Sequence, residues 1–238
     1  MTPTAAPVRS PPGAPESTYR LQFHAGFRFA DAAELVPYLA DLGITHVYAS
    51  PYLMARPGST HGYDVADPTR INPEIGTEAD LRAFAAALRE HGMAHILDIV
   101  PNHMGVATND NPYWNDVLAG GRDSRYAGFF DIDWHPAGAG WTGRLLLPVL
   151  GGPLAEVLGR GELKLVREAG AFAIAYWDRR FPVAPGTLPP GADDRTADAI
   201  NADAGRLAAL LDAQHYRLAD WRTAADEINY RRFFDIND

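Results

Sequence analysis

An α/β fold with a parallel sheet is the fold class that the sequence predicts, from three features. Short apolar runs at 44–50 and 95–100 suit strands that are covered on both faces. Apolar residues at helical spacing precede each run, at 31–42 and 77–91. Polar residues collect directly after both runs, where parallel α/β folds place their chemistry. A barrel and an open doubly wound sheet both satisfy this order of elements.

The first crossover unit begins with a strand expected at 18–23. The helix that follows should take Asp31 as its N-cap, because Glu34 stands three residues later in a capping-box pattern. Gly43 occupies the position just past the end of this helix. The strand at 44–50 comes next and should stop at Pro51, which cannot donate a backbone hydrogen bond.

The second crossover unit has similar signals. Thr77 and Asp80 form another N-terminal capping pattern, and the helix should end before Gly92. The strand at 95–100 follows directly, and Pro101 is expected to end its ladder. Two helices that each lead into a buried strand indicate successive right-handed crossovers in one sheet.

The regular alternation of predicted strands and helices stops after His103. The next stretch is rich in Gly, Pro, Trp and Asp and is far too long for an ordinary connection, so we expect an inserted subdomain. A helix at about 198–213 should then return to the main sheet. Within the insertion, strands are expected at 145–149, 163–166 and 171–177, and an exposed proline-rich loop at 182–194.

Composition limits the class of protein. The chain has 238 residues, of which 47% are hydrophobic, so it can bury a large core. Its formal net charge of -9 argues against nonspecific binding to nucleic acid or to an anionic membrane. Cysteine is absent, which excludes disulfides and zinc-thiolate sites. No apolar run could span a bilayer, and residues 1–17 are expected to be a disordered tail, so we expect a cytoplasmic protein.

Candidate binding residues lie on two loops that follow predicted strands. Both loops should reach the same rim of a parallel sheet. Each candidate also has a purely structural alternative. The acids and imidazoles could only cap turns, and the loop tyrosine could pack against the rest of the protein. The loop after 18–23 lacks glycine-rich phosphate spacing, so a nucleotide site is not expected. The candidates are His61, Tyr63 and Asp64 in the glycine-flanked loop 58–65, and Asp98, Asn102 and His103 after the later strand.

The segment Asp98-Ile-Val-Pro-Asn102-His103 has the Asp-x-x-x-Asn-His pattern. With the long insertion after it, this segment resembles the third-strand motif of the α-amylase-type glycoside hydrolase superfamily. The resemblance implies the N-terminal portion of a (β/α)8 TIM barrel with a large inserted subdomain after the third strand. The implied division is barrel strands 1–3 at 18–103, the inserted subdomain B at 104–197, and a return toward strand 4 at 198–238.

Further segments are similar to the intramolecular glucosylmutases of that superfamily. This similarity implies that a maltooligosaccharide is the substrate and that its reducing-end α-1,4 linkage becomes the α,α-1,1 linkage of trehalose. It also implies a trehalose-releasing hydrolase as pathway partner. An α-amylase-like α-glucan hydrolase and a noncatalytic glucan-binding fragment are the alternatives. The segments are 17–22, 58–65, 99–104, 147–151, 214–219 and 227–238.

The resemblance also implies residue roles. His103 would bind a hydroxyl of the glucose at the cleavage site, Tyr63 would stack on that ring, and Asp98 and Asn102 would orient the rim. His61 and Asp64 are weaker candidates, for outer sugar contacts. No cofactor is expected, and no metal is assigned, because no cluster of acidic and carbonyl ligands is recognisable in the insertion.

The superfamily's catalytic carboxylates have no counterpart in this sequence. Its nucleophile lies in a Gly-x-Arg-x-Asp segment, which does not occur among the 238 residues. We therefore expect the chain to be part of a longer enzyme, and to be inactive and poorly folded by itself. Five tryptophans are further candidate sugar platforms, although packing is the commoner role for each: Trp114, Trp134, Trp141, Trp177 and Trp221.

Overall fold

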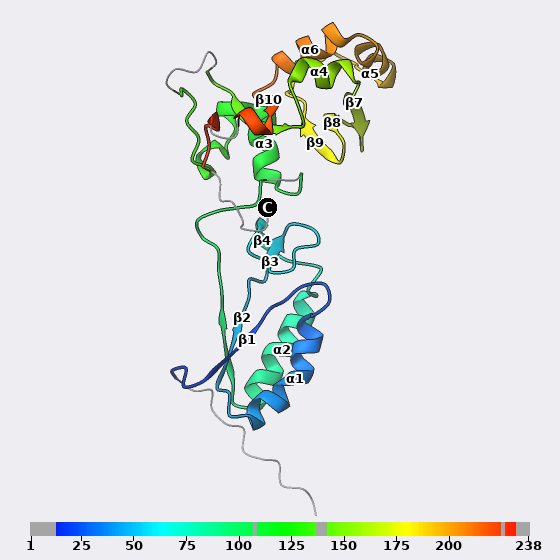
Figure 1. Ribbon diagram of the computed structural model, residues 1–238. Helices are drawn as coiled ribbons and strands as arrows, with labels where there is room; N and C mark the ends of the chain where they lie inside the picture. The colour runs from blue at the N-terminus through cyan, green and yellow to red at the C-terminus, as the bar shows by residue number, and fades with distance from the viewer. Residues whose placement is uncertain (1–12, 107–108, 137–141, 225–226, 232–238) are drawn as a thin grey trace, which may run out of the picture. The chain divides into compact units, whose positions relative to one another are not determined.

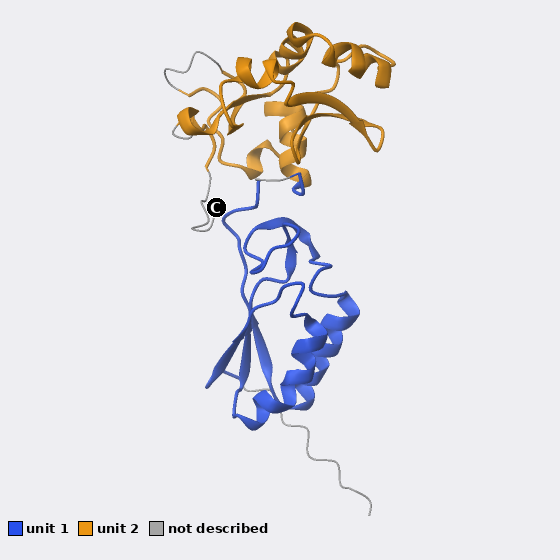
Figure 2. Cartoon of the chain, turned by 45° about the vertical axis from the view of Figure 1, so that its right-hand side comes forward, with its two compact units in different colours: residues 1–111 blue, residues 112–238 orange. Residues whose placement is uncertain are grey.

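A computed structural model describes residues 13–106, 109–136, 142–224 and 227–231 (Figure 1). The chain divides into two compact units, residues 1–111 and 112–238 (Figure 2). Each unit has its own sheets and helices. Within the described ranges, no helix is long and apolar enough to cross a membrane.

The first unit contains a three-stranded parallel sheet in the order β1-β2-β5. Helix α1 connects β1 to β2, and α2 precedes β5, so both predicted crossover units are confirmed. Strands β3 and β4 form a separate antiparallel hairpin that the sequence did not indicate. The bounds are β1 Thr18–Leu21, α1 Phe29–Asp41, β2 His46–Ala49, β3 Leu53–Ala55, β4 Val65–Ile71, α2 Glu78–Glu90 and β5 Ala94–Leu97.

The cap predicted for α1 is wrong by one turn. Arg28 is the N-cap, and Asp31 is the third helical residue, where its carboxylate accepts the backbone N–H of Arg28 at 2.7 Å. Asp31 therefore supplies the acidic half of a capping box and not the cap itself. The cap of α2 is as predicted, with Thr77 and Asp80 bonding each other's backbone amides.

Strand β5 ends earlier than predicted. Its last ladder bond is from the Asp98 amide to the carbonyl oxygen of Ala49, at 2.9 Å. Beyond this point the neighbouring strand reaches Ser50 and Pro51, and a proline has no N–H to extend the ladder. The proline that ends β5 is therefore on its partner strand, and Asp98 begins the loop.

An aromatic cluster fills the space between this sheet and its two helices. The ring of Phe23 lies 5.2 Å from Phe29, 5.4 Å from Tyr52 and 6.0 Å from Phe84, measured between ring centroids. Alternate strand residues such as Val47 point into the cluster and are fully buried. The remaining strand side chains point away from the helices, because successive residues of a strand alternate between faces.

The second unit combines two small sheets with helices. Strands β6 and β10 are parallel neighbours, and β7, β8 and β9 form an antiparallel meander. The strands expected at 145–149, 163–166 and 171–177 are confirmed as β6, β7 and β8. The bounds are α3 Pro112–Gly120, β6 Leu145–Leu150, α4 Leu154–Gly159, β7 Leu163–Glu168, β8 Ala171–Tyr176, β9 Arg179–Pro182, α5 Asp194–Asn201, α6 Ala204–Asp212, β10 Tyr216–Asp220 and α7 Trp221–Ala224, with short 3-10 turns at Gly121–Asp123 and Ala127–Phe129.

The inserted subdomain was expected to span 104–197, but the second compact unit of the structure spans 112–238. The single helix expected at 198–213 is two helices, because the Asp203 side chain accepts the amides of Gly205 and Arg206 and starts a new helix there. Asn201 bonds both backbone groups of Leu165, at 2.7 and 2.8 Å, and so ties α5 to β7. These helices therefore belong to the second unit, which starts at Pro112.

Part of the tail expected at 1–17 is bonded to the first unit. Residues 1–12 lie outside the described residues. The amides of Glu16 and Ser17 both donate to the Thr45 hydroxyl at 3.1 Å, so the chain joins the first unit before β1 begins.

Candidate functional site

Three polar side chains lie together on the sheet face that points away from the helices. The register pairs Arg20 of β1 with Tyr48 of β2, and Tyr48 with Ile96 of β5. Asp98 stands two residues after Ile96 and so falls on the same face. Parallel pairing thus gathers Arg20, Tyr48 and Asp98 at the carboxyl end of the sheet.

Asp98 is the acceptor at the centre of this cluster. Its Oδ2 atom accepts the hydroxyls of Tyr48 at 2.7 Å and Tyr63 at 2.6 Å. Arg20 Nη2 donates to the oxygen of Tyr63 at 2.9 Å, and Arg20 Nη1 lies 3.9 Å from Asp98 Oδ2. Tyr63 therefore accepts from a cation and donates to an anion, and both bonds fix the direction of its phenol.

These contacts set the protonation states of the cluster. The hydrogen bonds from Tyr63 and then Tyr48 hold the pKa of Asp98 below its usual value, with smaller help from the Ile99 amide and Arg20. Burial, followed by the bond to Asp98, raises the pKa of Tyr63. The bond to Asp98 raises the pKa of Tyr48. At neutral pH the carboxylate is therefore charged, and both phenols keep the protons they donate.

We expect this cluster to lose its stabilising effect in acid. A carboxyl group whose pKa is depressed by folding stabilises the folded state above its unfolded pKa, and this effect disappears as the pH falls through the folded pKa. In the complete protein that contains these residues, the difference in melting temperature between the unmodified form and Asp98→Asn should therefore shrink as the pH falls below about 4. A difference that stays constant from pH 6 to pH 2 would contradict this assignment.

The loop between β3 and β4 presents Tyr63 together with His61. The two rings are 5.9 Å apart at an angle of 26°, and the amide of Tyr63 donates to His61 Nδ1 at 3.0 Å. His103 Nε2 lies 3.2 Å from the carbonyl oxygen of Tyr63, and His103 Nδ1 lies 3.1 Å from Asn102 Oδ1. His103 therefore links the loop after β5 to the loop that carries Tyr63.

Asp64 has a different part in this loop. Its carboxylate accepts the Ser59 hydroxyl at 2.5 Å, and its carbonyl oxygen accepts the Arg56 amide at 3.0 Å. The Ser59 oxygen also accepts the amide of Gly62 at 3.0 Å. These bonds close the loop on itself, which favours the turn-capping alternative for Asp64.

Gly62 is the tightest backbone position of the loop. Its φ is +79°, and a Cβ atom there would lie 2.9 Å from the carbonyl oxygen of Pro51. We expect Gly62→Ala to destabilise the chain by about 1–3 kcal/mol, because it adds a backbone clash to an unfavourable φ.

Gly58 is a matched control for this substitution. Its φ is +76°, and no atom lies within 4 Å of the position of an added Cβ. Gly58→Ala should therefore show only the cost of the backbone conformation, and its melting temperature should fall less than that of Gly62→Ala. Equal losses would show that the contact with Pro51 contributes nothing.

Arg20 and Tyr48 were not among the predicted site residues, although a signal for them exists. In β1 and β2 the buried residues Leu21, Val47 and Ala49 mark the face toward the helices. Arg20 and Tyr48 alternate with them and therefore occupy the other face. The Arg20 guanidinium carbon also lies 5.1 Å from the centre of the Tyr48 ring, a cation–π contact that holds the arginine over the sheet.

All six predicted residues belong to one connected group in the first unit. Asp98 is already occupied by two phenols and is charged, which suits an anchor better than a proton donor. Around it lie a partly buried aromatic ring, two partly buried imidazoles and an exposed amide, which suit the apolar faces and hydroxyls of a sugar. Among the described residues, no group of three or more His, Cys, Asp or Glu side chains could hold a metal ion.

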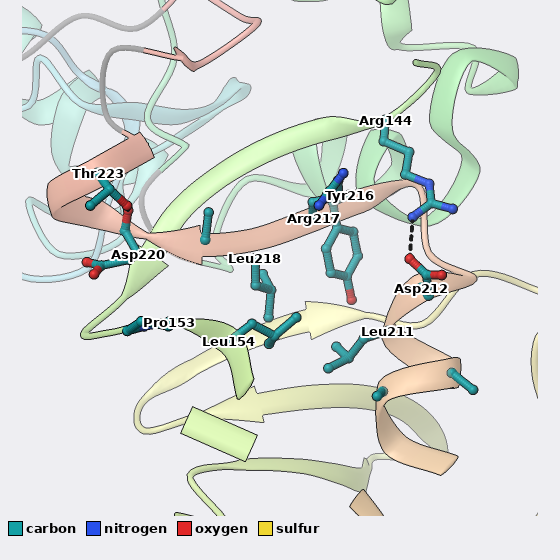
Figure 3. A pocket seen from close by; sticks show the side chains of 13 residues that line it. Arg144, Pro153, Leu154, Leu211, Asp212, Tyr216, Arg217, Leu218, Asp220 and Thr223 are labelled. Carbon is teal, nitrogen blue, oxygen red and sulfur yellow. Dashed lines mark hydrogen bonds and ion pairs between the residues drawn. The ribbon is translucent and has the colours of Figure 1, made fainter. Parts of the chain in front are cut away.

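A pocket of about 590 Å³ lies in the second unit (Figure 3). Strand β10, helix α6 and the start of α4 form its walls, which are mostly apolar, and an ion pair joins Arg144 to Asp212 at 3.1 Å. None of the six predicted site residues lines this pocket. It is therefore separate from the Asp98 cluster.

Comparison of the sequence with known proteins shows which families this chain resembles. The family model "Alpha amylase, catalytic domain" matches residues 32–144. A protein of Mycobacterium tuberculosis described as a putative maltooligosyl trehalose synthase is 43% identical over 228 residues, which cover 92% of this chain and 26% of that protein. The chain thus spans about a quarter of the length of this relative.

Solved structures agree with these sequence matches. Maltooligosyltrehalose synthase from Arthrobacter ramosus is 44% identical, with a TM-score of 0.75 over 94% of this chain and 26% of that one. A hypothetical maltooligosyl trehalose synthase of Sulfolobus tokodaii is 34% identical, with a TM-score of 0.73 over 93% and 27% of the two chains. The strand order and these likenesses together give a partial TIM-barrel-type fold. Residues 32–144 match the α-amylase catalytic domain, and over the residues it spans the chain is a homologue of the maltooligosyl trehalose synthases.

Proposed function

We propose that this chain forms the substrate-binding front of a maltooligosyl trehalose synthase. The observation that supports this most strongly is the 44% identity with the Arthrobacter enzyme over 94% of this chain. The reaction would be an intramolecular transfer: the glucose at the reducing end is released from its α-1,4 bond and is joined again through an α,α-1,1 bond. A glycosyl-enzyme intermediate with retained configuration accounts for such a transfer.

The cluster around Asp98 supports a binding role for its neighbours. In our proposal Tyr63 stacks on the glucose ring at the cleavage site, and His103 binds one of its hydroxyls. Asp98 and Asn102 are positioning residues, because each touches a side chain that faces the sugar. His61 contributes an outer contact beside Tyr63, whereas Asp64 shapes the loop.

The finer fold assignment is also part of the proposal. Strands β1, β2 and β5 would be the first three strands of a (β/α)8 barrel, and the second unit would be the subdomain inserted after the third strand. Support comes from the parallel order β1-β2-β5 and from the division of the chain at Asn111/Pro112. We also propose a trehalose-releasing hydrolase as the pathway partner, since a glucan capped by trehalose is the product.

Product analysis tests this function. The complete protein that contains these 238 residues should be expressed and incubated with maltopentaose. We expect a nonreducing product of unchanged length, detected by loss of reducing sugar and by the α,α-1,1 signals in the NMR spectrum. Tyr63→Ala and His103→Ala should each lower kcat/KM by about 100-fold, since poor positioning of a substrate costs that much.

Two other results would replace the proposal. Accumulation of shorter reducing sugars would instead identify an α-amylase-like hydrolase that passes the same intermediate to water. Saturable glucan binding without any product would identify a noncatalytic glucan-binding protein. Chromatography separates the capped pentasaccharide from shorter sugars such as maltotriose and glucose. The third result shows neither product, so the three results are distinct.

A further inference from the structure

The structure separates the candidate tryptophans by their surroundings. Trp114 is 3% exposed and packs against the rings of Phe130 and Tyr230, so it belongs to the core. Trp134 is partly buried, and Trp141 lies outside the described residues. Trp177 is 71% exposed and Trp221 is 52% exposed. Among the tryptophans that the structure describes, these two are the exposed ones.

Trp177 occupies a position that does not suit its size. It stands in a two-residue turn between β8 and β9, where Tyr176 pairs with Arg179, and its φ is +52°. Such turns favour glycine or asparagine at positions of positive φ, and a bulky residue there is strained. The ring gains little burial in return. Neither turn geometry nor packing therefore explains a tryptophan at this position.

Trp221 directly follows β10 and is the first residue of α7. Strands β6 and β10 are parallel, and Leu150 pairs with Asp220, so Gly151 and Trp221 leave the sheet at the same edge. The guanidinium of Arg222 lies 4.7 Å from the centre of the Trp221 ring. A cation over one face holds the ring and leaves its other face available for stacking.

The peptide groups of Gly151 join the two tryptophan-bearing segments. Its amide donates to the Tyr176 hydroxyl at 2.9 Å, and its carbonyl oxygen accepts Arg222 Nη1 at 3.2 Å. Tyr176 directly precedes Trp177, and their rings are 6.3 Å apart. These two bonds anchor the residue before Trp177 and the residue after Trp221 to the same glycine.

Polar groups accompany the rings on this edge. Asp220 and Thr223 flank Trp221 and Arg222 in sequence and also line the pocket of about 590 Å³ (Figure 3). Asp178 lies beside Trp177 in the turn, and Arg180 Nη1 donates to the Trp177 carbonyl oxygen at 2.9 Å. Exposed aromatic faces with carboxylates, a hydroxyl and guanidiniums close by are suited to pyranose rings and their hydroxyls.

We propose that the edge formed by Trp177 and Trp221 is an additional binding surface for α-1,4-glucan chains, made wholly of residues of the second unit. The choice of an α-glucan as ligand rests on the proposed function. Each exposed ring stacks on the apolar face of one glucose unit, and the surface holds a stretch of the glucan other than the glucose at Tyr63.

The test is titration of the complete protein that contains these 238 residues with maltoheptaose by calorimetry. Trp177→Gly and Trp221→Ala should each weaken binding about threefold to tenfold, the range expected when one stacking contact is lost. The double variant should weaken it by about the product of the two effects. Tyr38→Ala, which removes an exposed ring from α1 of the first unit, is the matched control and should leave the affinity unchanged.

The glycine substitution separates binding from stability. Because glycine accepts the φ of +52° without strain, Trp177→Gly should keep or raise the melting temperature while it weakens binding. Affinity of the complete protein that is unchanged in the double variant overturns the proposed surface. The maltopentaose assay tests the proposed function independently, since trehalose-capped product can form whether or not the double variant loses affinity.

Discussion

Replacement of Asn229 with alanine is expected to lower the free energy of unfolding by about 3 kcal/mol or more. Asn229 is 4% exposed, and its side chain bonds the backbone of two other segments. Its Oδ1 accepts the Leu146 amide at 2.9 Å, and its Nδ2 donates to the carbonyl oxygens of Asp133 at 2.7 Å and Arg144 at 2.9 Å. Alanine would leave three backbone groups without partners in a site that water barely reaches.

Asn201 supplies a matched control for this variant. Its amide also bonds two backbone groups, those of Leu165, but the residue is exposed. Water can replace these bonds after Asn201→Ala, so that variant should lose about 1 kcal/mol or less. Urea denaturation of both variants measures the difference. Equal losses would mean that burial of the Asn229 amide contributes nothing to the stability of the second unit.

Replacement of Asp98 with alanine is expected to lower kcat/KM of the complete protein on maltopentaose by about 100-fold. Without the carboxylate, the hydroxyls of Tyr48 and Tyr63 lose their common acceptor, and Arg20 loses its counterion. Tyr63 would then leave the orientation in which we propose that it stacks on the substrate. The effect should appear in KM as well as kcat, because ground-state positioning is disturbed.

Tyr48→Phe is the control for this positioning role. It removes one of the two phenol donors but leaves the bonds of Tyr63 to Asp98 and Arg20 in place. Its loss of kcat/KM should be about tenfold at most, close to the value of a single charge-assisted hydrogen bond. An Asp98→Ala enzyme with unchanged KM for maltopentaose would contradict the idea that Asp98 positions Tyr63.

Much of the first unit could be predicted because its signals are local. Thr77 and Asp80 cap α2 through contacts three residues apart, and Gly43 and Gly92 stand at the helix ends with positive φ. The error at Asp31 arose because an acid can serve either as the cap or as the third residue of a capping box. Strand β9 was missed because Arg179, Arg180 and Pro182 do not follow the apolar alternation of a strand.

Three features could be predicted from the sequence alone: the crossover order of the first unit, the resemblance to a known family, and the two loops that carry the candidate site residues. These features depend on short-range periodicity and on contiguous motifs. Other features became visible only in the folded structure: Arg20 and Tyr48 join Asp98, Asp64 closes its own loop, and Gly151 bonds both Tyr176 and Arg222. Each of these depends on strand register or on hydrogen bonds between distant segments, whose partners are chosen by the packing of the whole unit.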